Sequence, residues 1–282
     1  MARLGINQYG KAETHLVRVF RDGPAHEIRD LTVSVALSGR MAPVHVHGDN
    51  SAVLPTDTQK NTVYAFAKEH GVGTPEQFAT RLARHFLGGA ITRARVAVSE
   101  APWTRLNDHA FTQSDRATRT ADVVAEGEQI WCASGIAGLV VLKTTHSEFH
   151  GFPRDRYTTL EETTDRVLAT EVAARWRHPG DADWETARRA LLDTFAAHHS
   201  LSLQQTLYAM GEAVLEACPT VAEIRLSMPN KHHFVVDLSP FGLENPNEVF
   251  HADDRPYGLI EAAVVRDDAP DPGPIWDPYP LI

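Results

Sequence analysis

The sequence of 282 residues has only two cysteines, Cys132 and Cys218, which lie far apart and outside any C-x-x-C spacing. A disulfide framework or a thiolate metal site needs more cysteines at closer spacing, so the sequence excludes both. A reducing compartment fits this cysteine content best.

Long apolar runs are also missing. No stretch approaches the roughly 18 residues that a membrane span requires. The N-terminal MARLGINQYGKAE has no apolar segment of the secretory type, and the C-terminal PLI differs from the peroxisomal S-K-L signal. We therefore expect a cytoplasmic protein that does not contact membranes.

Positive charge is in deficit. The sequence has 27 Lys and Arg but 37 Asp and Glu, which gives a formal net charge of −10. Binding to nucleic acid requires clustered Lys and Arg, and the sequence has no such cluster. The hydrophobic content of 43% and the charged content of 23% are those of an ordinary globular protein.

What the sequence does contain is one order of elements used twice. Alternating apolar residues predict strands, and apolar residues three and four apart predict helices. The first half predicts strand, strand, helix, helix, strand and strand over residues 14–23, 26–40, 56–71, 74–89, 91–100 and 110–124. The second half repeats this order over residues 137–145, 166–178, 183–199, 202–219, 221–238 and 258–268. We predict an α+β protein built from two ββααββ modules.

Capping residues delimit two of the predicted helices. Thr74 precedes one of them as N-cap, with Pro75 at the first position and Gln77 at the third. Ser202 is the predicted N-cap of the last helix, which Pro219 terminates. These signals support the helix positions independently of the apolar pattern.

The predicted modules span residues 1–130 and 131–266, followed by a C-terminal arm over residues 267–282. The arm is rich in Pro and Asp, which favours a surface segment over an extension of the fold. Its Trp276 and Tyr279 are candidates for packing on a neighbouring subunit.

The stretch VHVHGDNS places His45 and His47 two residues apart. On a strand both imidazoles would face one side and could bind a divalent cation. A metal site needs a third ligand, and the sequence has no H-E-x-x-H and no second H-x-H. Histidines that face solvent or another subunit are therefore favoured over a metal site.

The stretch SMPNKHHFVVDL raises a similar question for His232 and His233. Alternation along a strand places adjacent side chains on opposite faces, so at most one of the two histidines should line a given pocket. One imidazole beside Asn230 and Lys231 is suited to moving protons. The alternative from these residues is a histidine that is hydrogen-bonded at the end of the strand and has no role in a reaction.

Thr56, Asp57 and Thr58 stand where a helix is predicted to begin. The simplest interpretation is a cap, in which Asp57 or Thr58 accepts hydrogen bonds from free backbone N–H groups. A helix start can also offer N–H groups and a hydroxyl to an anionic ligand. From its sequence position beside Gly10 alone, Lys11 is expected to be an ordinary lysine whose charge is exposed to solvent.

Residues 147–166, SEFHGFPRDRYTTLEETTDR, show no apolar periodicity. Loops of this length inside compact domains are usually functional. An aromatic ring and an arginine can hold a flat anionic heterocycle, because the ring stacks on its face and the guanidinium grips its edge.

Five segments, in this order and spacing, resemble the urate oxidases (uricases) along nearly the whole chain: NQYGKAE, TDTQKNTVYAFAK, VLKTTHSEFHGFPRDRYTTLEETTDR, LQQTLY and SMPNKHHFVVDL. The resemblance implies the tunnelling fold, in which antiparallel sheets carry helices on one face and a homotetramer encloses a barrel-lined tunnel. It also implies active sites at subunit interfaces. The implied reaction is the cofactor-independent oxidation of urate by O2 to 5-hydroxyisourate, with release of H2O2, in purine catabolism.

The resemblance implies a catalytic relay of Lys11, Thr56 and His232. Lys11 would act as the base through the Thr56 hydroxyl, and His232 would shuttle the proton. A urate anion that loses a further proton is electron-rich enough to give an electron directly to O2, so the reaction needs a strong base and no metal. A lysine removed from water gives up its proton more easily, which suits a general base.

The resemblance also implies the substrate contacts. Phe149 would stack on the purine, Arg166 and Gln204 would grip one edge, and the Leu203 N–H would add a contact. Leu203 stands where a valine is usual, a change that a backbone contact tolerates. The remaining contacts would come from the Thr56–Asp57 backbone of a neighbouring subunit and from Asn230, which would hold O2 or water above the ring.

Two other interpretations stay open. One is a metal-dependent tunnelling-fold enzyme that acts on a pterin or purine through His45 and His47. The other is a non-catalytic homologue that binds purines, although the relay residues would then have no purpose.

Overall fold

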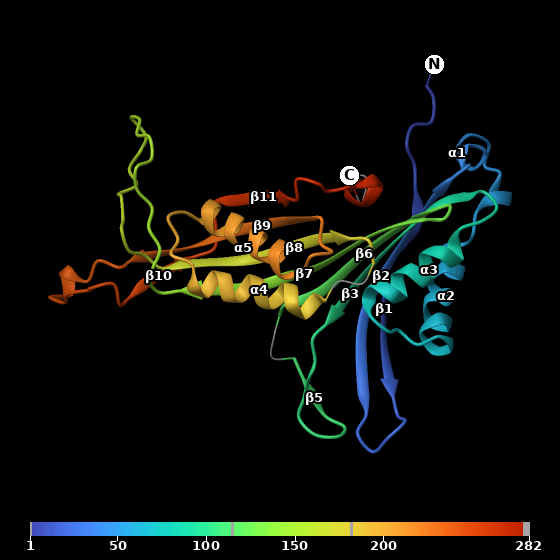
Figure 1. Ribbon diagram of the computed structural model, residues 1–282, viewed down its shortest axis with the longest axis horizontal. Coiled ribbons are helices and arrows are strands. Elements are labelled where there is room, and N and C mark those ends of the chain that lie inside the picture. Colours follow the sequence, from blue (N-terminus) through green and yellow to red (C-terminus); the bar gives the residue numbers. More distant parts are fainter. Residues whose placement is uncertain (1, 114–115, 181–182, 279–282) are drawn as a thin grey trace. The chain divides into compact units, whose positions relative to one another are not determined.

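The computed structural model describes residues 2–113, 116–180 and 183–278 (Figure 1). The chain divides into two compact units. The first unit comprises residues 1–135, 175–182 and 269–282, and the second comprises residues 136–174 and 183–268. The module limits expected from the sequence, at 130/131 and 266/267, stay a prediction.

The first unit is a sheet with helices on it. Its main elements are β1 (Tyr9–Phe20), β2 (Glu27–Gly39), α2 (Thr56–Glu69), α3 (Pro75–Phe86), β3 (Ile91–Ala101) and β6 (Thr118–Glu126). The strands follow the order β1-β2-β3-β6, with antiparallel neighbours. Helix α3 packs on β3 and β6, and α2 packs on β1. Short elements complete this unit: α1 (Ala42–His47), η1 (Asn50–Ala52), β4 (Thr104–Arg105), β5 (Phe111–Thr112) and η3 (Gly273–Trp276).

The second half of the chain repeats the order. Strands β7 (Gln129–Lys143) and β8 (Leu168–His178) are followed by α4 (Trp184–Ala197), α5 (Leu203–Ala217), β9 (Glu223–Val235) and β11 (Leu259–Val265), with η2 (Ser239–Phe241) and β10 (Phe250–Asp253) inserted. Strand β9 pairs with β11 along its first part and with β10 at its end. Helix α5 packs on β9 and β11. The doubled ββααββ order predicted from the sequence is therefore confirmed.

The apolar alternation sets the register of the first sheet. Val33 pairs with Val98 and Val35 with Val96, and all four side chains are buried. Phe78 of α3 is buried in the same core. Because side chains alternate along a strand, a shift by one residue would move all these valines to the opposite face.

Hydrogen bonds at the helix starts follow two of the predicted caps. The Thr74 hydroxyl accepts from the Gln77 N–H at 3.2 Å, and the Gln77 side chain accepts from the Thr74 N–H at 3.2 Å. The Ser202 hydroxyl accepts from the Gln205 N–H at 3.2 Å. Both N-caps are confirmed.

The C-terminal segment packs on its own chain. Ile275 is buried against Val124 and Ala133 of the first unit. The Arg175 guanidinium lies 5.1 Å from the ring centre of Trp276. Tyr279, the other aromatic residue considered for a subunit contact, lies outside the described residues.

In the described parts of the chain, no helix is both long enough and apolar enough to cross a lipid bilayer.

We expect Thr74→Ala to lower the free energy of unfolding by about 1 kcal/mol, because it removes one half of the capping box. Urea unfolding followed by circular dichroism measures the change. Thr62→Ala is the control, because Thr62 lies inside α2 with its hydroxyl donating to the Thr58 carbonyl, where alanine is tolerated well. An unchanged midpoint for Thr74→Ala would contradict this account of the helix start.

Candidate active site

The second unit holds a cavity of about 630 Å³. Four of the predicted catalytic and substrate-binding residues line it, namely Phe149, Arg166, Asn230 and His232. They come from the long loop between β7 and β8 and from the end of β9. Segments about 80 residues apart in the sequence therefore meet at one cavity, as the family resemblance implied.

Arg166 lies over the ring of Phe149, with 5.2 Å between the guanidinium carbon and the ring centre. Its Nε donates a hydrogen bond to the Ser147 hydroxyl at 3.4 Å. Burial lowers the pKa of Arg166. Within the described residues no carboxylate pairs with this guanidinium. A partly buried cation over an aromatic ring favours a flat, anionic ligand, whose charge would offset the loss of hydration.

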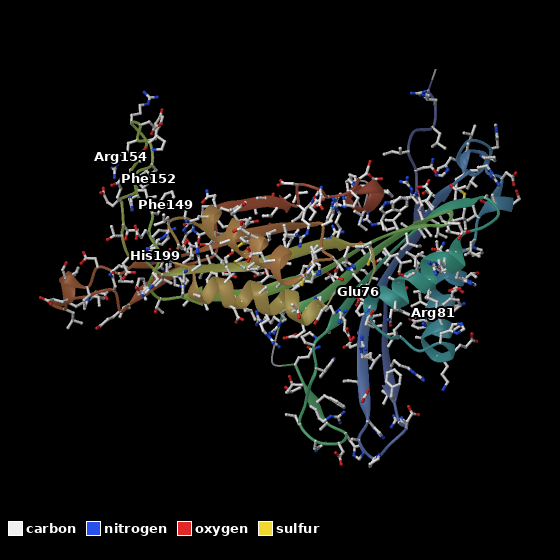
Figure 2. The ribbon with its side chains drawn as sticks, viewed as in Figure 1. Glu76, Arg81, Phe149, Phe152, Arg154 and His199 are labelled. Atoms are coloured by element: carbon white, nitrogen blue, oxygen red, sulfur yellow. The ribbon has the colours of Figure 1, made fainter. Side chains whose placement is uncertain are left out.

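The loop that carries Phe149 is held by short-range contacts. Residues 144–167, all described, form no helix or strand, as expected, and contain only isolated bridges. Phe149 and Thr163 exchange two backbone hydrogen bonds of 2.8 and 3.0 Å. The Phe152 ring stacks on Phe149 with 5.0 Å between centres and 18° between planes, and Arg154 lies over Phe152 (Figure 2). One face of the Phe149 ring is thereby supported from within the loop.

Strand β9 places Asn230 and His232 at a change of partner. Pro229 pairs with Leu259 of β11, whereas His232 pairs with Asp253 of β10. The buried Thr170 hydroxyl donates to the Pro229 carbonyl at 2.8 Å. This contact fixes the backbone immediately before Asn230. The strand is therefore held in place at the point where its pairing partner changes and the cavity begins.

The prediction that only one of the two adjacent histidines lines a pocket is wrong. Both His232 and His233 line the cavity and are half-buried. Adjacent side chains of a strand still point to opposite faces. At the end of β9 both side chains are only half-buried, and the cavity reaches both faces of the strand. The His233 Nδ1 donates to the Lys231 carbonyl at 3.0 Å, and its ring contacts Phe250 edge-on.

Leu203 and Gln204 do not line this cavity. They form the first turn of α5, where Leu203 is buried and Gln204 is exposed. A bridge between Ser147 and Ser200 ties the segment before α5 to the loop, and Ser147 is the residue that accepts from Arg166. The helix start is thus linked to the cavity through one serine.

The remaining predicted residues, Lys11, Thr56 and Asp57, belong to the first unit. The Leu54 N–H donates to the Tyr9 hydroxyl at 3.0 Å. Leu54 lies two residues before Thr56, and Tyr9 lies two residues before Lys11. The contact therefore holds the start of α2 against β1 at the level of Lys11.

The backbone beside Lys11 is tightly constrained. A β-carbon at Gly10 would lie 1.8 Å from the Val35 carbonyl oxygen, so only glycine fits this approach of β1 to β2. The register of β1 against β2 shifts between Lys11 and Thr14, and Glu13 has a φ of 54°. Such bulges redirect a side chain and are common beside active sites.

The helix start at Thr56 differs from the expected cap. Pro55 occupies the N-cap position of α2, and no side chain accepts from the first N–H groups. Asp57 accepts instead from Lys60 at 2.5 Å and from Asn61 at 3.0 Å. A hydrogen bond from Lys60 lowers the pKa of Asp57, with a smaller contribution from the charge of Lys11. The capping interpretation is wrong, because the Asp57 carboxylate binds the side chains of Lys60 and Asn61 and not the backbone N–H groups of the first turn.

His45 and His47 lie on the short helix α1 and not on a strand. Residues two apart on a helix point in nearly opposite directions, so the expected shared face is absent. The His45 Nδ1 donates to the Met41 carbonyl at 2.9 Å. In the described part of the chain, no group of three or more His, Cys, Asp or Glu side chains is arranged to hold a metal ion.

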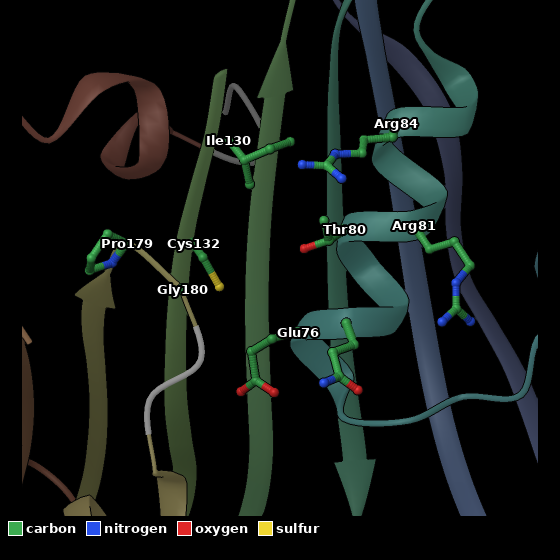
Figure 3. A pocket seen from close by; sticks show the side chains of 9 residues that line it. Glu76, Thr80, Arg81, Arg84, Ile130, Cys132, Pro179 and Gly180 are labelled. Atoms are coloured by element: carbon green, nitrogen blue, oxygen red, sulfur yellow. The ribbon is translucent and has the colours of Figure 1, made fainter. Parts of the chain in front are cut away.

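The first unit has a second cavity of about 530 Å³, between α3 and the ends of β7 and β8 (Figure 3). Its lining includes Glu76, Arg84 and Cys132 but none of the predicted site residues. Glu76 accepts from the Ser134 hydroxyl at 2.6 Å and from Arg119 at 2.7 Å. These contacts satisfy a buried carboxylate, which is a structural role.

The sequence is similar to one protein family along most of its length. The uricase family model matches residues 7–126 and 132–261. The uricase of Arthrobacter globiformis is 54% identical over 282 residues, which covers 97% of this chain and 93% of that protein. The uricase of Danio rerio is 38% identical over 281 residues, which covers 92% of this chain and 93% of that protein.

Solved structures agree with the sequence relatives. The crystal structure of Arthrobacter globiformis uricase has a TM-score of 0.94 at 52% identity, covering 98% of this chain and 99% of that chain. The urate oxidase of Bacillus sp. TB-90 has a TM-score of 0.82 at 23% identity, covering 93% of this chain and 100% of that chain. The second likeness shows that the fold is shared.

We expect Lys60→Met to raise the pKa of Asp57 towards the ordinary value of about 3.9, because it removes the main hydrogen bond to the carboxylate. The pKa of Asp57 is depressed in the folded protein. Its contribution to stability is therefore present above the unfolded-state pKa and is lost as pH falls through the folded-state pKa. Carbon NMR titration of labelled aspartates measures the shift. Lys68→Met, at the other end of α2, is the control; an unchanged Asp57 titration in Lys60→Met would refute the assignment.

Proposed function

We infer that this chain, which belongs to the uricase family, is an oxidoreductase that oxidises urate with O2. The observation that carries this function is Arg166 lying over the Phe149 ring in one cavity, without a carboxylate partner among the described residues. Urate is flat and anionic, so it matches both groups. The products we propose are 5-hydroxyisourate and H2O2, which places the reaction in purine breakdown.

We propose that the protein recognises the purine by stacking on its face and by hydrogen bonds to its edge. Phe149 stacks on the ring, and Arg166 binds the edge with two parallel hydrogen bonds. Gln204 and the Leu203 N–H contact the same edge from the first turn of α5, where the helix offers free N–H groups. The link from Ser200 through Ser147 to Arg166 supports this arrangement, because it couples the helix start to the cavity.

The reaction is balanced without a bound cofactor. Urate, O2 and water give 5-hydroxyisourate and H2O2, so urate loses two electrons and O2 gains them. Removal of a further proton from the urate anion raises its energy and makes electron transfer to O2 feasible. Lys11 is the proposed base, acting through the Thr56 hydroxyl, and His232 shuttles the proton. Asn230 holds O2 or water above the ring.

The relay is proposed to assemble between subunits of a homotetramer, in which the sheets close a barrel around a tunnel. Lys11, Thr56 and Asp57 would come from one subunit, and Phe149 and the other contacts from its neighbour. Thr56 and Asp57 are exposed in the single chain, which supports this assignment. The backbone of Thr56 and Asp57 would meet the purine edge opposite Arg166. A cytoplasmic location stays a prediction.

The direct test follows urate loss, O2 uptake and H2O2 formation together, using protein treated with a chelator. We expect all three at equal rates. Activity that appears only after a metal is restored would favour the metal-dependent alternative. Tight urate binding with no turnover would identify a non-catalytic purine-binding protein.

We expect Lys11→Ala to lower kcat more than tenfold while KM for urate changes less, because the variant loses the base and keeps the stacking contacts. Lys68→Ala, which removes a lysine from the last turn of α2, serves as the control. Steady-state kinetics on both variants decide the matter. Unchanged turnover in Lys11→Ala would remove Lys11 from the role of base.

A further inference from the structure

Glu148 joins two histidines from different segments. One carboxylate oxygen accepts from the His150 Nε2 at 2.8 Å, and the other oxygen accepts from the His199 Nε2. The Glu148 side chain is only 18% exposed, whereas both histidine side chains are about half exposed. These hydrogen bonds, from His199 first and then His150, hold the pKa of Glu148 below its usual range. The carboxylate is therefore the inner member of a bridge between two segments of the second unit.

Backbone hydrogen bonds follow the same path. The Glu148 N–H donates to the Ser200 carbonyl at 2.7 Å, and the Ser200 N–H donates to the His146 carbonyl at 2.9 Å. Figure 2 shows His199 at the base of the loop that carries Phe149. Glu148, which directly precedes Phe149, thus connects the loop with the residues that lead into α5.

We propose that Glu148 is a positioning residue for urate, because its bridge between His150 and His199 holds the Phe149 ring in register with the first turn of α5. This inference rests on the proposed function, in which Phe149 binds the purine face while Leu203 and Gln204 bind its edge. Stacking and edge hydrogen bonds must form at the same time. A displacement of one element relative to the other by about 1 Å can cost a large factor in binding or rate.

The two oxygens of one carboxylate are needed for this bridge. In a glutamine one of these two oxygens is replaced by an NH2 group, so the imidazole that contacted that oxygen loses its acceptor. The NH2 group can donate to that imidazole only if the ring presents an unprotonated nitrogen. Glu148→Gln therefore keeps the shape and weakens the bridge, while Glu148→Ala removes it.

The experiment compares Glu148→Ala and Glu148→Gln with the wild-type protein in urate oxidation. We expect Glu148→Ala to raise KM for urate about tenfold with kcat within about threefold, because the relay residues lie on other segments. The KM of Glu148→Gln should lie between the values of the wild-type protein and Glu148→Ala. Glu216→Gln is the matched control, since Glu216 is exposed near the end of α5 and loses the same charge.

A double-mutant cycle separates positioning from a general loss of stability. His199→Ala should raise KM in the wild-type background and change it less than about twofold in the Glu148→Ala background, because the contact is already lost. Calorimetric binding of xanthine, which shares the dione edge of urate, should weaken in parallel without any turnover. If Glu148→Ala does not fold, Glu148→Gln and His199→Ala carry the same comparison.

Equal KM and xanthine affinity in these variants and the wild type would overturn the proposal, even if the variants unfold more easily. That result differs from a failure of the proposed function, in which the wild-type protein itself would not consume urate.

Discussion

The partial burial of Arg166 over Phe149 is the constraint on which the candidate site depends. Removing a guanidinium from water is unfavourable, and among the described residues a serine hydroxyl and an aromatic face are the partners that offset this cost. Contacts within the surrounding loop hold the backbone on either side of Arg166. These contacts are the Phe149–Thr163 backbone pair, the Phe152 stack and the Ser147–Ser200 bridge. The same features leave a cation and a flat ring ready for an anionic heterocycle.

In the first unit, backbone contacts likewise fix the positions of Lys11 and of the start of α2. The close approach at Gly10 and the bulge after Lys11 fix the backbone beside the proposed base. The Tyr9–Leu54 hydrogen bond fixes the start of α2 against the same strand. Each group of functional residues is thus organised within its own unit. Preorganised groups lose little freedom when substrate binds, which favours stabilisation of the transition state.

Much of the fold could be predicted from the sequence because its signals are local. The valine alternation in β2 and β3 and the Thr74 and Ser202 caps depend on residues a few positions apart, and the structure confirms them. The family resemblance rested on whole segments and led to the cavity residues.

Other features depend on contacts that no local pattern contains. The stretch around His45 alternates like a strand but forms α1, with a proline at its start and a left-handed Gly48 at its end. Those two residues were the signal that could have indicated a helix. The second histidine in the cavity follows from a change of strand partner, and the Glu148–His199 contact joins residues 51 positions apart. Neither feature has a periodicity that could reveal it in advance.

We propose that the two groups of residues complete one site across a subunit boundary. Mixing Lys11→Ala protein with Asn230→Ala protein, after dissociation and reassembly, tests it most directly. Each variant alone should be nearly inactive, and the mixture should recover about a quarter of wild-type activity, because a random assembly of two chains leaves that share of interface sites intact. No recovery, although mixed assemblies form, would contradict the account and place both residues in sites within a single chain.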